Sequence, residues 1–200
     1  EKYMVLKNAY NLYDGLQKLG ITNLRQQQEA PMQAIFDGKD AIVLMPTAGG
    51  KSLLYQLPAV MDDTGKLTLV ISPLKALQLD QVDALRSKGI RAAVLNSDLS
   101  AAEHSSVLED MTRRGGLLYL APEQLQNMAV ADALRTANLT RIAVDEAHTL
   151  PQAKDDFRKA YGKVGSFIHS LPHRPQVIAL TATATLNDVS LIRKSLGIPN

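Results

Sequence analysis

The chain has 200 residues, a formal net charge of +2 and 46% hydrophobic residues, enough to bury the core of one large α/β domain. It contains no cysteine, which excludes a disulfide framework and a thiolate metal site. No apolar run approaches the roughly 18 residues of a membrane span, and the first residues show no signal peptide. We therefore expect a cytoplasmic protein (nucleoid-associated in a bacterium, nuclear in a eukaryote) without a membrane partner.

Apolar residues near the N-terminus recur at helical spacing. They predict a helix over 3–19 that stops at Gly20, and a second helix over 26–36. Strand-like and helix-like segments then alternate. The expected strands are 41–45, 67–71, 91–95, 117–120, 141–145 and 176–181, and the expected helices are 51–60, 74–88, 100–113, 122–136, 155–170 and 185–196. The alternation predicts an α/β fold: a mostly parallel sheet with helices on both faces, which binds ligands beyond the carboxyl ends of its strands.

A glycine-rich segment, Thr47-Ala48-Gly49-Gly50-Lys51-Ser52, follows the first of these strands and precedes a helix. Glycines let a backbone approach phosphate groups, and a helix N-terminus attracts their negative charge. Lys51 would reach the β and γ phosphates of a nucleotide, and the Ser52 hydroxyl would bind Mg²⁺. The usual pattern G-x-x-x-x-G-K-[ST] begins with glycine where this chain has Met45. The alternative is a glycine-lysine turn before an ordinary helix.

Two adjacent carboxylates, Asp145 and Glu146, follow the strand expected at 141–145. Mg²⁺ takes few protein ligands and keeps several waters, so Asp145 can hold it through a water. Glu146 is then placed to orient or deprotonate an attacking water. The alternative is the solvated start of a helix, where acidic residues suit the helix dipole.

Several segments together resemble a known family. DEAH (145–148) with TAT (181–183) resembles motifs II and III of superfamily 2 helicases. Further segments resemble the RecQ branch of this superfamily: LRQQQE (24–29), MPTAGGKSLLYQLP (45–58), SPLKAL (72–77), DQV (80–82) and LYLAPEQL (118–125). The resemblance implies a P-loop NTPase domain, the first of two RecA-like lobes in an ATP-dependent 3′-to-5′ DNA helicase. Such an enzyme uses ATP and Mg²⁺ to move along single-stranded DNA and unwind duplex junctions in DNA repair and recombination.

The resemblance also implies a role for individual residues. Gln28 would read the adenine edge, with Arg25 stacked on the base. The catalytic residues would be Lys51, Asp145 and Glu146, and the residues that bind Mg²⁺ would be Ser52 and Asp145. The implied nucleotide-binding loop is Pro46, Thr47, Ala48, Gly49, Gly50, Lys51, Ser52 and Leu53. The residues implied to couple nucleotide to DNA are His148, Thr181, Ala182 and Thr183, and those implied to contact DNA are Ser72, Pro73, Lys75, Gln81, Asn96, Phe157 and Arg158.

For three of these assignments an ordinary structural explanation remains as an alternative. Arg25 and Gln28 fit a solvated helix start, and His148 fits an ordinary hydrogen-bonded histidine. Segment 72–77 fits a helix N-cap, although a helix N-terminus also suits a phosphate contact.

The chain departs from the RecQ pattern at three places. Ala48 stands where the family usually has a glycine, and Ile21 where relatives often place an aromatic residue against adenine. In the loop after the carboxylates, Ala153 and Asp155 replace the tryptophan and histidine that sense single-stranded DNA. An aromatic platform for a base is worth about 1–3 kcal/mol, so we expect looser coupling between DNA and ATP hydrolysis.

We divide the chain into N-terminal helices with the adenine-reading motif (1–36) and the first helicase lobe (37–200). No candidate for a second RecA-like lobe is visible, so we expect these residues alone to hydrolyse ATP very slowly and unwind nothing. A non-catalytic nucleotide- or DNA-binding module of a divergent helicase-like protein is one alternative. A P-loop kinase for a small molecule is another, and the helicase order of the motifs argues against it.

Overall fold

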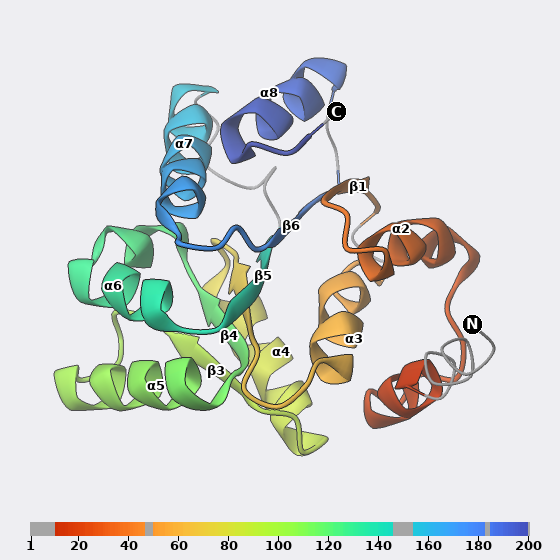
Figure 1. Cartoon of the computed structure of the whole chain (residues 1–200), viewed down its shortest axis with the longest axis horizontal. Coiled ribbons are helices and arrows are strands. Elements are labelled where there is room, and N and C mark those ends of the chain that lie inside the picture. The colour runs from red at the N-terminus through yellow and green to blue at the C-terminus, as the bar shows by residue number, and fades with distance from the viewer. Residues whose placement is uncertain (1–10, 47–49, 146–153, 183–184, 200) are drawn as a thin grey trace.

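A six-stranded parallel sheet forms the centre of the computed structural model, which describes residues 11–46, 50–145, 154–182 and 185–199, the side chains of 154–161 excepted. The strand order is β1-β6-β5-β2-β4-β3, and every described pair is parallel (Figure 1). The strands are β1 (Ala41–Leu44), β2 (Leu67–Ile71), β3 (Ala92–Leu95), β4 (Gly116–Leu120), β5 (Leu139–Val144) and β6 (Gln176–Thr181). The predicted α/β class and parallel sheet are confirmed.

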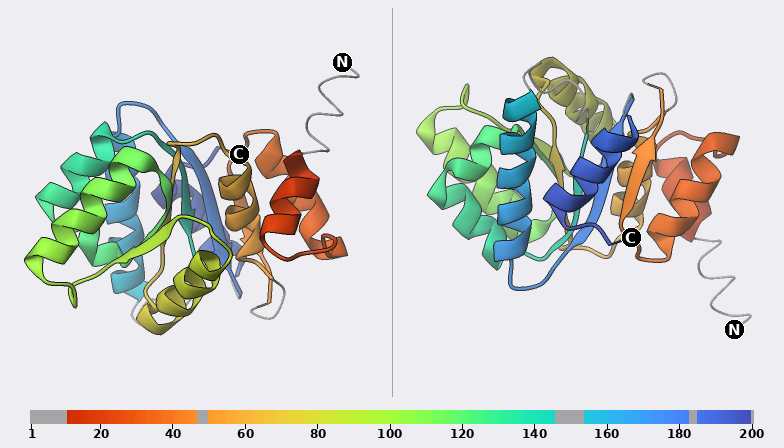
Figure 2. Two further views of the ribbon diagram at one scale, coloured as in Figure 1. Left: turned by 90° about the horizontal axis from the view of Figure 1, so that it is seen from below. Right: turned by 90° about the horizontal axis from the view of Figure 1, so that it is seen from above.

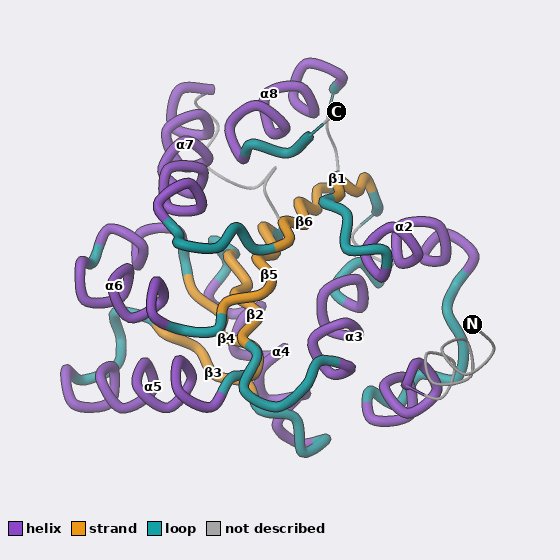
Figure 3. Tube along the Cα trace, viewed as in Figure 1, coloured by secondary structure: helices purple, strands orange, loops and turns teal. Residues whose placement is uncertain are grey.

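Helices connect successive strands, as the alternation predicts (Figure 3). After a helical stretch over 11–18 come α2 (Gln26–Phe36), α3 (Leu53–Met61), α4 (Lys75–Ser87), α5 (Ala101–Arg114), α6 (Met128–Thr136), α7 (Lys154–Ser170) and α8 (Leu186–Leu196). One expectation was wrong, because 122–136 is not a single helix. A 3₁₀ helix, η2 (Pro122–Gln126), ends at Asn127, whose backbone is extended and whose side chain accepts a hydrogen bond from the Ala129 amide. Asn127 therefore caps α6 instead of continuing the preceding turn.

The two faces of the sheet carry separate hydrophobic cores. Stretch 11–18, α2, α3 and α4 cover one face, and α5 to α8 cover the other (Figure 2). Strand β2 shows how one sequence serves both cores, since Leu69 and Ile71 point into one and Val70 into the other. Strands covered on both faces read as continuous apolar runs, which is why they were recognisable in the sequence. The division of the chain at residue 36 stays a prediction.

A polar cluster around buried Arg141, at the amino end of the sheet, fixes α2 in place. Arg141 of β5 is 8% exposed; its Nη1 lies 2.8 Å from Asp62 Oδ2, and its Nε donates to Gln176 Oε1 at 3.0 Å. Gln176 Nε2 in turn donates to the carbonyls of Ile35 and Lys39, at the end of α2. The helix that carries Gln28 is thereby tied to strands β5 and β6.

No described helix is long and apolar enough to cross a membrane.

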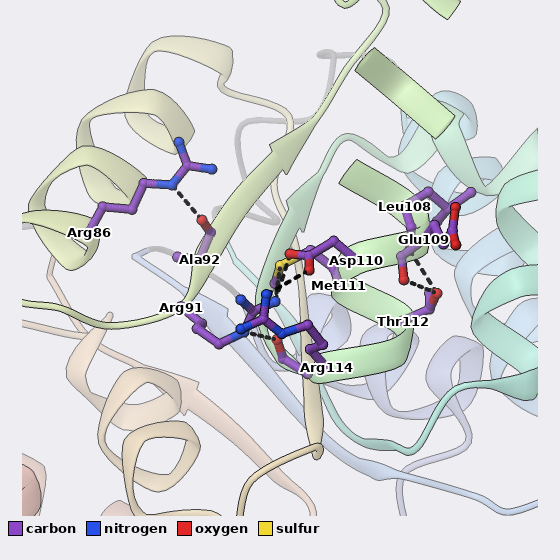
Figure 4. Close-up of polar contacts among 10 residues, drawn as sticks. Arg86, Arg91, Ala92, Leu108, Glu109, Asp110, Met111, Thr112 and Arg114 are labelled. Carbon is purple, nitrogen blue, oxygen red and sulfur yellow. Dashed lines mark hydrogen bonds and ion pairs between the residues drawn. The ribbon is translucent and has the colours of Figure 1, made fainter. Parts of the chain in front are cut away.

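Arginine side chains secure the edge strand β3 where it begins (Figure 4). Arg86 Nε donates to the Ala92 carbonyl at 2.7 Å, which covers an acceptor at the sheet edge. Arg91 Nη2 donates to Asp110 Oδ2 at 2.7 Å, and Arg114 Nη1 lies 3.3 Å from the other oxygen of that carboxylate. Hydrogen bonding from Arg91 lowers the pKa of Asp110 below its ordinary value.

Asp110→Asn should therefore lower stability in a pH-dependent way. A carboxyl group whose pKa is depressed on folding stabilises the folded state above its unfolded pKa, and this contribution disappears as the pH falls through the folded pKa. Because the side chain is 39% exposed, we expect a difference of at most about 1 kcal/mol at pH 7, shrinking towards zero below about pH 4. Urea denaturation of both proteins at pH 7 and pH 3 measures it; a difference that grows in acid would contradict this role of Asp110.

Candidate functional site

The phosphate-loop segment leads from β1 into α3, as the sequence predicts. Gly50 has φ +73°, a conformation that favours glycine, and Lys51 and Ser52 form a turn before α3 begins at Leu53. Ser52 is the N-cap residue, but its side chain makes no capping hydrogen bond, so capping does not consume its hydroxyl. Leu53 is buried in the core, which anchors the first turn of the helix below the loop.

An ion pair joins this loop to the end of β5. Lys51 Nζ lies 3.3 Å from Asp145 Oδ1, and the two side chains are only 6% and 2% exposed. The Asp145 amide donates to the Ile71 carbonyl at 2.8 Å, which extends the pairing of β5 with β2 up to the carboxylate. Residues far apart in the sequence thus meet at the carboxyl ends of the strands, where the motif reading expects them.

A tyrosine that the sequence motifs did not predict as a site residue also contacts the Lys51–Asp145 pair. Tyr55 of α3 is fully buried, and its hydroxyl donates to Asp145 Oδ2 at 2.8 Å. Its ring packs edge-to-face on Tyr119 of β4, with centroids 6.4 Å apart. Burial raises the pKa of both tyrosines, so Tyr55 stays a hydrogen-bond donor at neutral pH. The available signal was a phenol one helical turn after Lys51, within a mostly apolar stretch.

The donor chemistry of this cluster fits a small divalent cation. The Ser52 hydroxyl and the Asp145 carboxylate could hold Mg²⁺, which prefers oxygen ligands and needs only one or two from the protein. Asp145 Oδ1 already faces a positive charge, the Lys51 ammonium. The carboxylate is therefore oriented towards the position of a cation.

The residue implied to read adenine contacts the phosphate loop directly. Gln28 is 3% exposed, so the solvated alternative is wrong for it, whereas Arg25 is exposed. Gln28 Oε1 accepts from the Arg25 amide at 2.8 Å, and its Nε2 donates to the Gly50 carbonyl at 3.0 Å. A cavity of about 480 Å³ adjoins these groups, a volume within the usual range of small-molecule sites. Its lining includes Ile21, Arg25, Gln28, Gly50, Ser52 and Gln56.

Of the residues implied to touch DNA whose side chains are described, all but one lie just beyond β2 or β3. Ser72 follows β2, and exposed Lys75 lies 3.4 Å from Asp98, whose amide donates to Asn96 Oδ1. Ser72 Oγ accepts a long 3.4 Å bond from the Leu74 amide, and α4 takes Leu74, not Ser72, as its N-cap. The exception is Gln81, whose Oε1 lies 3.0 Å from the Tyr55 hydroxyl.

The other implied residues divide between described and undescribed parts. Thr181 is buried at the end of β6, where its carbonyl accepts from the Met45 amide, and Ala182 follows it. Pro46 is exposed after β1, and Pro73 is half-buried after Ser72. Outside the described residues lie Thr47, Ala48, Gly49, Glu146, His148, Ala153 and Thr183. Phe157 and Arg158 lie on α7, but their side chains are not described.

Comparison with known proteins identifies the family of this chain. The chain matches the DEAD/DEAH box helicase family over residues 25–192. The chain belongs to this family. It is 44% identical to the probable ATP-dependent DNA helicase RecS of Bacillus subtilis, over 84% of this chain and 34% of that protein. It is 38% identical to the ATP-dependent DNA helicase RecQ of Haemophilus influenzae, over 90% of this chain and 29% of that protein. The RecQ-type resemblance is confirmed, and the chain spans about a third of the length of these relatives.

Solved helicase structures share the fold of this DEAD/DEAH box lobe. The DUF1998 helicase MrfA bound to DNA superimposes with a TM-score of 0.78 at 24% identity, over 94% of this chain and 28% of that one. A likeness at this identity shows the RecA-like fold.

Gly50→Ala should disturb both the loop of this helicase lobe and Gln28. An added Cβ would lie 2.6 Å from Gln28 Nε2, and φ +73° strains any residue but glycine. Gly38→Ala is a matched control, because Gly38 has φ +78° and open space around it. We expect a loss of about 1 kcal/mol in the control, and about 1–2 kcal/mol more for Gly50→Ala, in urea denaturation. Equal losses would show that the contact between Gln28 and Gly50 contributes nothing.

Proposed function

We propose that this chain is the ATP-binding lobe of an ATP-dependent 3′-to-5′ DNA helicase of RecQ type. The whole protein would couple ATP hydrolysis to movement along single-stranded DNA and to duplex unwinding. The observation that carries the proposal is the buried contact between Lys51 and Asp145 at the carboxyl ends of β1 and β5. The names of the relatives support the activity, and a DNA-bound helicase among the structural neighbours supports the substrate.

The nucleotide would enter between the loop and α2. Gln28 and Arg25 would contact the adenine, and the backbone of 46–53 would surround the phosphates. The Lys51 ammonium would exchange the Asp145 carboxylate for phosphate oxygens, while Asp145 and Ser52 face the metal. Mg²⁺ would supply charge neutralisation of the phosphates and their leaving group. Glu146, next to Asp145 in the sequence, would take the proton of the attacking water.

DNA would pass over the ends of β2 and β3. The turns that hold Ser72 and Asn96 lie there beside exposed Lys75, and backbone amides with a lysine suit phosphate contacts. Thr181 and Ala182, at the end of β6 next to β5, would transmit the nucleotide state. A second RecA-like lobe of the whole protein would add an arginine finger, worth roughly 10³–10⁵ in rate.

Lys51→Ala and Asp145→Asn, each in the full-length protein, should abolish function. Removing the phosphate lysine or the metal carboxylate removes charge stabilisation of the transition state, so we expect DNA-stimulated ATP hydrolysis and unwinding to fall at least a hundredfold. Lys66→Ala, at a half-exposed lysine 3.8 Å from Asp63, is the control and should leave both rates unchanged. The 200-residue lobe alone should hydrolyse ATP very slowly. Full activity of Lys51→Ala would favour a non-catalytic binding module instead.

A further inference from the structure

We infer that Tyr55 is a positioning residue for the metal carboxylate and that it links this carboxylate to α4 through Gln81. The inference rests on the proposed function, because it concerns the Mg²⁺–nucleotide site of that function. Its basis is a hydroxyl shared by two side chains, with Asp145 Oδ2 at 2.8 Å and Gln81 Oε1 at 3.0 Å.

Tyr55 and Lys51 hold opposite oxygens of one carboxylate. Lys51 Nζ lies against Oδ1, and the Tyr55 hydroxyl donates to Oδ2. A carboxylate held at both oxygens cannot rotate about its Cβ–Cγ bond without losing a charge-assisted contact. When Lys51 turns to a phosphate group, Tyr55 keeps Oδ2 in place, and Oδ1 remains directed to the side where Lys51 and Ser52 lie.

The tyrosine ring is itself fixed. Its side chain is fully buried, and it packs edge-to-face on Tyr119 at an interplanar angle of 68°. The Tyr119 hydroxyl accepts a 3.1 Å hydrogen bond from Gln56, the residue after Tyr55 on α3. Helix α3 and strand β4 therefore determine where the Tyr55 hydroxyl points, and a rigid donor positions an acceptor more sharply than a mobile one.

Gln81 gives this hydroxyl a second contact. A phenol has one proton, and a carboxylate can only accept, so the proton goes to Asp145. Amide nitrogen and oxygen exchange places on a simple flip, and with its NH₂ group towards Tyr55 the Gln81 amide donates to the same hydroxyl. Gln81 lies on α4, whose first residue is Lys75, one of the proposed DNA contacts. A shift of α4 on DNA would thus change how Tyr55 holds Asp145.

Nucleotide affinity with and without metal tests the positioning role in the full-length protein. The probe is fluorescent ADP, titrated in Mg²⁺ and in EDTA, and the readout is the gain in affinity that Mg²⁺ provides. In Tyr55→Phe we expect this gain to fall about tenfold while the affinity in EDTA is unchanged, because the donor that orients Asp145 is lost together with its contact to Gln81. Tyr119→Phe, which removes the neighbouring hydroxyl, should keep the full gain.

The outcomes separate this inference from the proposed function. A wild-type protein that gains no affinity from Mg²⁺ would refute the nucleotide site itself. A wild-type gain that persists in Tyr55→Phe, or is lost equally in Tyr119→Phe, would overturn the role of Tyr55 alone.

Gln81→Leu tests the link between Tyr55 and α4. Unlike Tyr55→Phe, it does not change a fully buried residue, so its result does not depend on whether such a variant folds. We expect single-stranded DNA to change the Mg²⁺ gain in the wild type at least threefold and to leave it unchanged in Gln81→Leu, with DNA affinity within twofold of the wild type. DNA affinity that falls tenfold instead would show that Gln81 contacts DNA, and would overturn the link.

Discussion

The buried ion pair between Lys51 and Asp145 is the contact on which the arrangement of the site depends. Two nearly inaccessible charges are stable only together, since removing one partner of such a pair costs about 3–5 kcal/mol. The pair also requires β1 and β5 to end at the same level with β6 between them, which a parallel sheet provides. The loop after β1 and the acidic end of β5 are therefore held in register before any nucleotide binds.

Around this pair, each neighbouring contact joins a different element to the same point. Gln28 brings α2 to the loop through the Gly50 carbonyl, and the cluster around Arg141 holds the far end of α2 on the sheet. Tyr55 brings α3 to the carboxylate, and Gln81 brings α4 to Tyr55. Three helices from one face of the sheet thus meet at one carboxylate and its loop. A nucleotide that displaced Lys51 from Asp145, as proposed above, would act on contacts shared by all of them.

How much of this could be predicted differs between fold and site. The strands were recognisable because burial on both faces gives continuous apolar runs, and the phosphate loop because its residue types lie next to one another. Asn127 broke an expected helix because a capping side chain depends on local backbone geometry that helical spacing does not encode. Tyr55 was missed because a tyrosine in an apolar helix reads as core until the strand order brings Asp145 beside it. The contact of Gln81 with Tyr55 could not be predicted, because a sequence does not tell which residues of α4 lie beside α3.

The charge balance of the pair constrains the order of events at the site. If Lys51 alone moved to a phosphate, the Asp145 carboxylate would remain buried without its countercharge. A divalent cation arriving with the phosphates replaces that countercharge and removes the cost of separating the pair. Nucleotide without metal would therefore have to break the ion pair and leave Asp145 without a countercharge. Nucleotide with metal would break the same pair but supply a cation in place of the lysine. In the proposed site, the buried ion pair would itself favour the metal-bound form of the nucleotide, before any catalytic step begins.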